Sequence, residues 1–236
     1  MPRGEGRLLV AVLLLVLFSN VPYGDYALYP FALFGTWVHE VGHALAALAM
    51  GGRVDHIQIF PDTSGLAYTA TSSRLAQATV SSAGYVGTAV FGGLLLALRR
   101  HPEAGRVGLA LLGASMLGTG LLWVRNGFGL VAVGVLGVAL LGAGLRLPRT
   151  ASLAVFTFLA ASTSLNAITS IRALFGSVQR VNGQPAGMTD ARAVADLLVI
   201  PWFLWASGWF VLALACTWAG LRAGGAQRRV TRPRRG

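Results

Sequence analysis

The chain has 236 residues, of which 55% are hydrophobic and only 11% are charged, and its mean hydropathy is +0.65. In a soluble globular domain about a quarter of all residues are charged, so the composition excludes an ordinary soluble enzyme. The formal net charge is +11, and all 19 basic residues are arginine. Because these arginines lie at the ends of apolar runs and after residue 221, they suit membrane topology and anionic headgroups, and no nucleic-acid partner is expected.

Apolar runs recur along the whole chain and are long enough to cross about 30 Å of hydrocarbon. The first run, residues 8–18, lacks a small-x-small cleavage pattern, which favours an uncleaved first span over a signal peptide. Further spans are predicted at residues 31–50, 77–98, 107–124, 127–145, 151–175 and 197–221. The predicted fold class is therefore an all-α polytopic membrane protein with about six to seven transmembrane helices.

In the segment after the second predicted span, apolar residues recur with a different period. Apolar and polar residues alternate over 54–60, turn-forming residues follow at 61–65, and a second short run covers 66–71. This pattern predicts a β-hairpin between two membrane helices. Irregular or extended backbone at membrane depth needs protein or a water-filled cavity beside it, so we expect a cavity next to the second span.

The expected organisation is one membrane-embedded domain over residues 1–221 and a basic, disordered tail over 222–236. Seven spans would leave the two termini on opposite sides of the membrane, and the arginine count then favours neither orientation clearly. The single cysteine, Cys216, excludes an internal disulfide and a cysteine-based zinc site. Arginine without lysine is compatible with a GC-rich bacterial genome, so the expected location is a bacterial cell membrane.

The second predicted span contains the pentad His39-Glu40-Val41-Gly42-His43. Histidines four residues apart lie on one helix face, where two neutral imidazoles can bind one Zn²⁺, and the intervening glutamate can act as general base on a water molecule. Ionisable groups inside a span are costly and are functional by default. Structural contacts in the bundle core are the alternative explanation of these three polar side chains.

A zinc site of this kind needs a third protein ligand. Most of the eight acidic residues lie in charged flanks or turns: Glu5, Asp25, Asp55, Asp62 and Glu103. Asp190 and Asp196 remain, near the start of the last span, and the residues alone do not separate them. Asp190 can also be explained as part of a helix start after Thr189.

The pentad with Ala44-Leu45, the following Gly51-Gly52-Arg53-Val54 and the hairpin resemble the site-2-protease-type intramembrane metallopeptidases, specifically the peptidase M50B-like branch. Later blocks that look like this branch are Ser82-Ala83-Gly84-Tyr85-Val86-Gly87, Arg125-Asn126, Arg180-Val181-Asn182-Gly183 and Thr189-Asp190-Ala191. The resemblance implies that residues 1–221 form a metallopeptidase domain, with zinc held by His39, His43 and Asp190 and with Glu40 as the catalytic base.

The resemblance also implies a zinc-dependent endopeptidase that hydrolyses peptide bonds of membrane proteins or peptides within or near the bilayer. The hairpin is then expected to hold an unwound substrate strand by edge pairing. A catalytically inactive membrane adaptor is the alternative, and a metal or solute transporter is a third class.

Three further polar side chains have alternative explanations. His56, in the hairpin, is expected to be a solvated strand histidine, and Asn126 is expected to be structural. Asn166, in the sixth predicted span, is equally compatible with binding substrate backbone and with tying two helices together.

Overall fold

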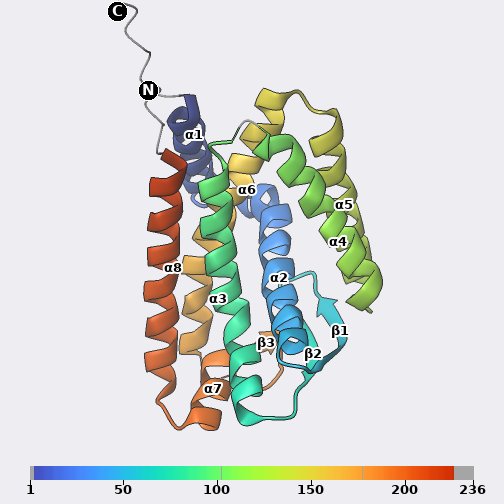
Figure 1. Cartoon of the computed structure of the whole chain (residues 1–236), viewed down its shortest axis with the longest axis vertical. Coiled ribbons are helices and arrows are strands. Elements are labelled where there is room, and N and C mark those ends of the chain that lie inside the picture. Colours follow the sequence, from blue (N-terminus) through green and yellow to red (C-terminus); the bar gives the residue numbers. More distant parts are fainter. Residues whose placement is uncertain (1–2, 102, 177, 226–236) are drawn as a thin grey trace, which may run out of the picture.

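The computed structural model describes residues 3–101, 103–176 and 178–225. These residues form a bundle of helices with two small hairpins at one end (Figure 1). The helices are α1 (Arg3–Phe18), α2 (Gly24–Ala49), α3 (Arg74–Leu98), α4 (Leu109–Trp123), α5 (Gly127–Arg146), α6 (Arg149–Thr169), α7 (Asp190–Leu198) and α8 (Trp202–Gly225), with short turns η1 (Ala104–Gly108) and η2 (Ser170–Phe175). The strands are β1 (Arg53–Ile59), β2 (Gly65–Ala70), β3 (Arg180–Val181) and β4 (Gln184–Pro185).

Within the described residues, five helical segments are long and apolar enough to cross a membrane. They are α3, η1 with α4, α5, α6 with η2, and α8. Helix α2 has 26 residues but is not among them, because His39, Glu40 and His43 lower its hydropathy. The chain is therefore a multi-pass helical membrane protein with a small hairpin after α2, as predicted.

The first helix does not make a separate crossing. The beginning of α1 lies in a groove with Ala154 and Val155 of α6, and Ala11 and Leu15 pack against Ala161, so α1 runs parallel to α6. Helix α2 runs in the same direction, since Phe31 packs on Phe158 and Gly35 lies beside Asn166.

Helices α1 and α2 together therefore cross the bundle once. The expectation that the two termini lie at opposite ends is wrong: α1 begins and α8 ends at the same end (Figure 1). At that end the guanidinium of Arg99, the C-cap of α3, donates hydrogen bonds to the carbonyls of Gly220 and Leu221 in the last turns of α8.

The final span begins later than predicted. Helix α7 ends at Leu198, Val199 has a left-handed backbone with φ 58°, and Pro201 precedes the first residue of α8. Proline lacks the amide hydrogen that a continuous helix requires, so the chain turns here and α8 starts at Trp202. Helix α8 continues to Gly225, and the rest of the expected tail, residues 226–236, lies outside the described residues.

The predicted hairpin is confirmed as the antiparallel pair β1–β2, with a bulge between Val54 and His56. The second edge of β1 is occupied, because Ile57 pairs with Val124 and the side chain of Asn126 both donates to and accepts from the backbone of Ile59. Asn126 is therefore structural, as expected. Among the described residues no strand pairs with the other edge of β2.

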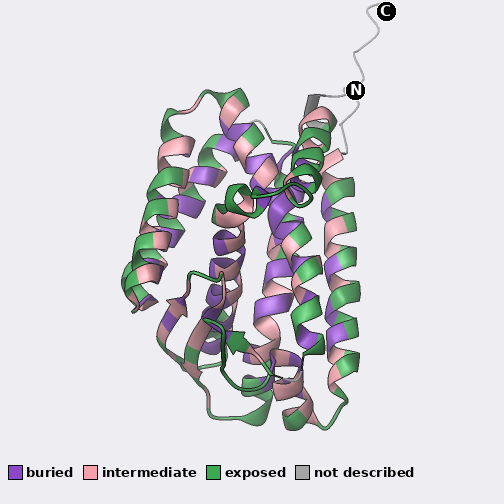
Figure 2. Cartoon of the chain, turned by 180° about the vertical axis from the view of Figure 1, so that it is seen from behind, coloured by how far each residue is buried: buried purple, intermediate pink, exposed green. Residues whose placement is uncertain are grey.

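Buried residues line the inner faces of the helices and exposed residues cover the outer faces (Figure 2). Lipid is as apolar as leucine, so close packing rather than hydrophobic burial holds such helices together. Helices α2 and α3 approach each other closely, because a Cβ on Gly42 would lie 2.8 Å from the carbonyl oxygen of Ala83. The small residues of α3 thus allow a close helix contact, and they bring α3 against the pentad.

Candidate metal centre

Helix α2 supplies three polar side chains to one buried region. His39 and His43 lie one turn apart, and their ring centroids are 4.7 Å apart with a nearly perpendicular orientation. Glu40 is only 4% exposed and His43 only 8%. Burial of three such groups in a membrane helix is unfavourable unless another group compensates them.

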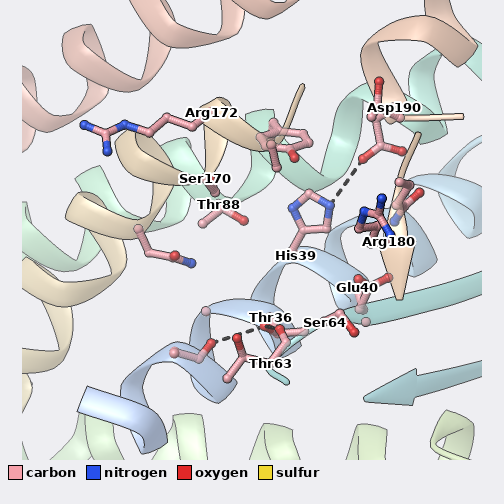
Figure 3. Close-up of a pocket in the computed structure, with 18 of the residues that line it drawn as sticks. Thr36, His39, Glu40, Thr63, Ser64, Thr88, Ser170, Arg172, Arg180 and Asp190 are labelled. Atoms are coloured by element: carbon pink, nitrogen blue, oxygen red, sulfur yellow. Dashed lines mark hydrogen bonds and ion pairs between the residues drawn. The ribbon is translucent and has the colours of Figure 1, made fainter. Parts of the chain in front are cut away.

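Asp190, the first residue of α7, provides that compensation. Its Oδ2 lies 3.4 Å from Nε2 of His39 and 3.6 Å from Nε2 of His43. Thr189 precedes the helix, but its side chain makes no capping hydrogen bond, and the carboxylate of Asp190 points toward His39 (Figure 3). Its position at the start of α7 therefore does not by itself explain Asp190, whose carboxylate also contacts the two histidines.

The spacing of these three atoms fits a tetrahedral metal site. Two ligand atoms that each lie about 2.0–2.1 Å from a zinc ion at the tetrahedral angle are about 3.3–3.4 Å from each other. The two measured separations, 3.4 and 3.6 Å, are close to this edge length and are longer than a strong hydrogen bond. Ligand atoms of His39, His43 and Asp190 all lie within 4.8 Å of one another, so this group could hold a metal ion.

The orientation of His43 also suits a metal ligand. Its Nδ1 lies 2.7 Å from the carbonyl oxygen of Val80 on α3, which accepts the Nδ1 hydrogen and leaves the Nε2 lone pair directed at Asp190. Metal-binding histidines characteristically donate their other ring nitrogen in this way, which fixes the tautomer and the ring. Tyr85 of α3 packs edge-on against the ring of His39, with centroids 4.7 Å apart, and stacks on Trp209 of α8.

Gly84 leaves the space that an ion would need. A Cβ on Gly84 would lie 2.5 Å from Nε2 of His43 and closer still to Nε2 of His39. A methyl group at this point would occupy nearly the same volume as an ion bound to both nitrogens, since zinc–nitrogen bonds are about 2.0–2.1 Å long. The absent side chain of Gly84 thus forms a cradle beside the two imidazoles.

Glu40 lies between the histidines and the hairpin. A Cβ on Gly65, at the start of β2, would lie 2.6 Å from Oε1 of Glu40, so the strand passes very close to this carboxylate. Glu40 and His43 also line a small cavity of about 120 Å³ together with Ala67 and Thr69 of β2. The unpaired edge of β2 therefore runs past the buried carboxylate.

A larger cavity of about 600 Å³ opens on the other side of His39 and Glu40 (Figure 3). Its lining combines residues of α2, α3, α6, η2, the β1–β2 turn and the β3 region, and polar groups are frequent. These polar groups are Thr36, Ser64, Thr88, Asn166, Ser170, Arg172, Gln179 and Arg180. The cavity predicted beside the second span is present and reaches the candidate metal centre.

The turn of the first hairpin is joined to the β3–β4 turn over this cavity. The amide of Gly183 donates to Oδ2 of Asp62 at 3.0 Å, and the amide of Asn182 donates to the hydroxyl of Ser64 at 3.0 Å. Partial burial favours the neutral carboxyl, but hydrogen bonds from Ser64 and Gly183 outweigh it and hold the pKa of Asp62 below its ordinary value. The two turns form what we call the clasp, defined by Asp62, Ser64, Asn182 and Gly183.

The structure thus brings His39, Glu40, His43 and Asp190 together, while Asp196 is exposed and outside the group. Their roles as ligands and base stay predictions. His56 stacks on Tyr68 and contacts Asp55, so it belongs to the hairpin surface. Gly84 was not among the predicted site residues, because nothing in the sequence marks which of the α3 glycines faces the histidines.

Comparison with known proteins gives one match. A family model described as Peptidase M50B-like matches residues 8–220, which is most of the chain. Neither the curated proteins nor the solved structures contain a significant match. The matched range includes the pentad, Gly84 and Asp190.

Proposed function

Because the chain belongs to the Peptidase M50B-like family, we propose that it is a zinc-dependent endopeptidase that hydrolyses peptide bonds of membrane-associated proteins or peptides in a bacterial cell membrane. The observation that carries this proposal is the meeting of two histidines of α2 with Asp190 of α7, with Glu40 buried beside them. The donor set, two imidazoles and a carboxylate, is one that catalytic zinc sites use, and it leaves a fourth position open.

His39, His43 and Asp190 would hold the metal through Nε2, Nε2 and Oδ2. Zinc in such a site polarises a substrate carbonyl and makes water a good nucleophile near neutral pH. Glu40 takes the proton from the attacking water and delivers it to the leaving amine. Val80 keeps His43 in the required tautomer through its carbonyl.

The substrate must present an extended backbone, because helical carbonyls are already hydrogen-bonded. The edge of β2 that is unpaired among the described strands runs beside Glu40 and can add one more strand. The opposite edge, on β1, is closed by Val124 and Asn126. A substrate segment paired with β2 would thus lie along the side of the hairpin that faces the candidate metal centre.

The test is cleavage of quenched fluorescent single-span peptides by the protein reconstituted in liposomes. We expect Glu40→Gln to lower the cleavage rate by at least about 100-fold, the scale of general acid–base catalysis, while zinc content stays at the wild-type value. Equal cleavage by wild type and Glu40→Gln would refute the mechanism. Peptide binding with zinc bound but without cleavage by the wild type would instead support the inactive adaptor.

A further inference from the structure

The 600 Å³ cavity contains two arginines from separate segments, Arg172 of η2 and Arg180 of β3. Gln179, the residue before Arg180, lines the small cavity together with Glu40 and Asp190, whereas Figure 3 shows Arg172 extending away from His39. Both residues are exposed, so their guanidinium groups are reached by water and by anything that enters the cavity. Arginine is suited to bind a carboxylate here, because its planar guanidinium group can donate two parallel hydrogen bonds to the two carboxylate oxygens.

Neither arginine has a charge partner in the part of the chain that the structure describes. The ion pairs found there involve other residues, and neither guanidinium donates a hydrogen bond to a protein acceptor. Arg192, in contrast, donates to the carbonyl of Gly176 and lies over the ring of Trp202. Two unpaired cations therefore remain in one cavity.

The acidic groups of the cavity are already engaged. Asp62 accepts hydrogen bonds from Ser64 and Gly183 in the clasp, Asp190 lies against the two histidines, and Glu40 is buried beside β2. A divalent cation at the candidate centre would balance the charges of Glu40 and Asp190. Asp62 keeps its negative charge, so the two arginines and Asp62 together leave the cavity with a net charge of +1, which attracts anions.

The remaining lining indicates which anion fits. Thr36 and Thr88 line the space, but their hydroxyls already donate to backbone carbonyls. Among the described residues the side chains of Asn166 and Ser170 make no such hydrogen bond, so an apolar helix would leave these two polar groups unpaired. A polar, extended peptide segment would satisfy them.

We propose that the cavity selects substrates in which the segment next to the scissile bond is polar and carries carboxylates, which pair with Arg180 and Arg172. This inference rests on the proposed peptidase function and names its substrate class. Arg180 lies closer to the catalytic groups and contacts a carboxylate near the scissile bond, and Arg172 contacts one further along the segment. Both are specificity residues rather than catalytic ones.

The test measures peptide binding, which does not depend on turnover. Three fluorescent decapeptides of serine and glycine, with two Glu, two Gln or two Lys, are titrated against detergent-solubilised Glu40→Gln protein loaded with zinc. We expect the Glu peptide to bind about threefold to fivefold more tightly per carboxylate than the Gln peptide, the scale of exposed ion pairs, and the Lys peptide to bind least. The difference should shrink at high salt.

Charge reversal provides the decisive comparison. The double variant Arg172→Glu/Arg180→Glu should invert the order of the Glu and Lys peptides, and each single reversal should remove most of the difference between them, whereas Arg53→Glu should leave the order unchanged. Arg53 is a matched control, since it is an exposed arginine of the other hairpin and is not among the residues that line this cavity. An inverted order also demonstrates that the variants fold.

Equal binding of the three peptides by the zinc-loaded Glu40→Gln protein would overturn the proposal, as would an unchanged order in the double reversal variant. In the latter case the arginines would serve lipid headgroups instead. Failure of the peptidase function is recognised separately, because wild-type protein would then cleave no single-span peptide of any charge while the binding order could still hold.

Discussion

Replacing Gly84 by alanine adds one methyl group to α3 at the point where the two imidazoles converge. The new carbon would lie 2.5 Å from Nε2 of His43 and closer to Nε2 of His39, where carbon and nitrogen atoms require more than 3 Å. The rings must therefore move, or the volume between them is filled. Either outcome removes the geometry in which two nitrogens lie about 2.0–2.1 Å from one ion.

The stability of the fold should change much less than the metal affinity. Alanine is favoured over glycine in a helix interior by about 0.8–1.0 kcal/mol, and overpacking costs about 1–3 kcal/mol, so the net loss is expected to be at most about 2 kcal/mol. Zinc per chain, measured by mass spectrometry on purified protein, should fall from close to one to close to zero. Cleavage should fall with it, by about 100-fold or more.

Gly87→Ala is the matched control for this variant. It lies one turn further along α3, and its added Cβ would be 3.8 Å from the nearest atom, Cα of Gly42, which is ordinary van der Waals contact. We expect Gly87→Ala to retain both zinc and cleavage. A Gly84→Ala protein that binds one zinc per chain and cleaves normally would refute the cradle assigned to Gly84.

The remaining predictions concern the third ligand, the clasp and the membrane orientation. Asp190→Ala should lose the zinc, whereas Asp196→Ala, which removes an exposed carboxylate six residues later, should keep it; zinc analysis of both proteins decides this. The lowered pKa of Asp62 means that its hydrogen bond from Gly183 is intact above the ordinary value of 3.8 and is lost as the pH falls through the lowered value. The protection factor of the Gly183 amide, which compares its exchange rate with that of an unstructured peptide at the same pH, should fall on acidification, and Asp62→Asn should remove that pH dependence. Eight of the 14 arginines in the described residues belong to the segments at the end of the bundle where α1 begins and α8 ends, and the sequence after α8 contains five more, which predicts that this end is cytoplasmic. An impermeant thiol reagent should then label Ser72→Cys in intact cells, and a C-terminal epitope should require permeabilisation; the reverse pattern would contradict the arginine rule here.

Local sequence signals were sufficient for the helices, the hairpin and the pentad. Apolar runs predict spans because a membrane helix makes all its backbone hydrogen bonds within itself. Alternating apolar and polar residues with turn residues between them predict β1–β2, because the alternation and the turn each depend on neighbouring residues only. The prediction failed where tertiary contacts decide: α1 looks like a span of its own by composition, but its contacts with Ala154 and Ala161 make it parallel to α2. The break before Trp202 was missed although Pro201 is its visible cause.

Composition and the four-residue spacing of the histidines are local properties, so they were enough to predict a membrane protein with two histidines on one helix face. The sequence left Asp190 and Asp196 equivalent, since both lie near the start of the same predicted span. Only the tertiary structure separated them, by placing the first turn of α7 against α2 and α3 so that one carboxylate faces the imidazoles and the other faces outward. The same packing gave Gly84 its place beside the rings, because the distance between two helices depends on the side chains of both and cannot be read from either one alone.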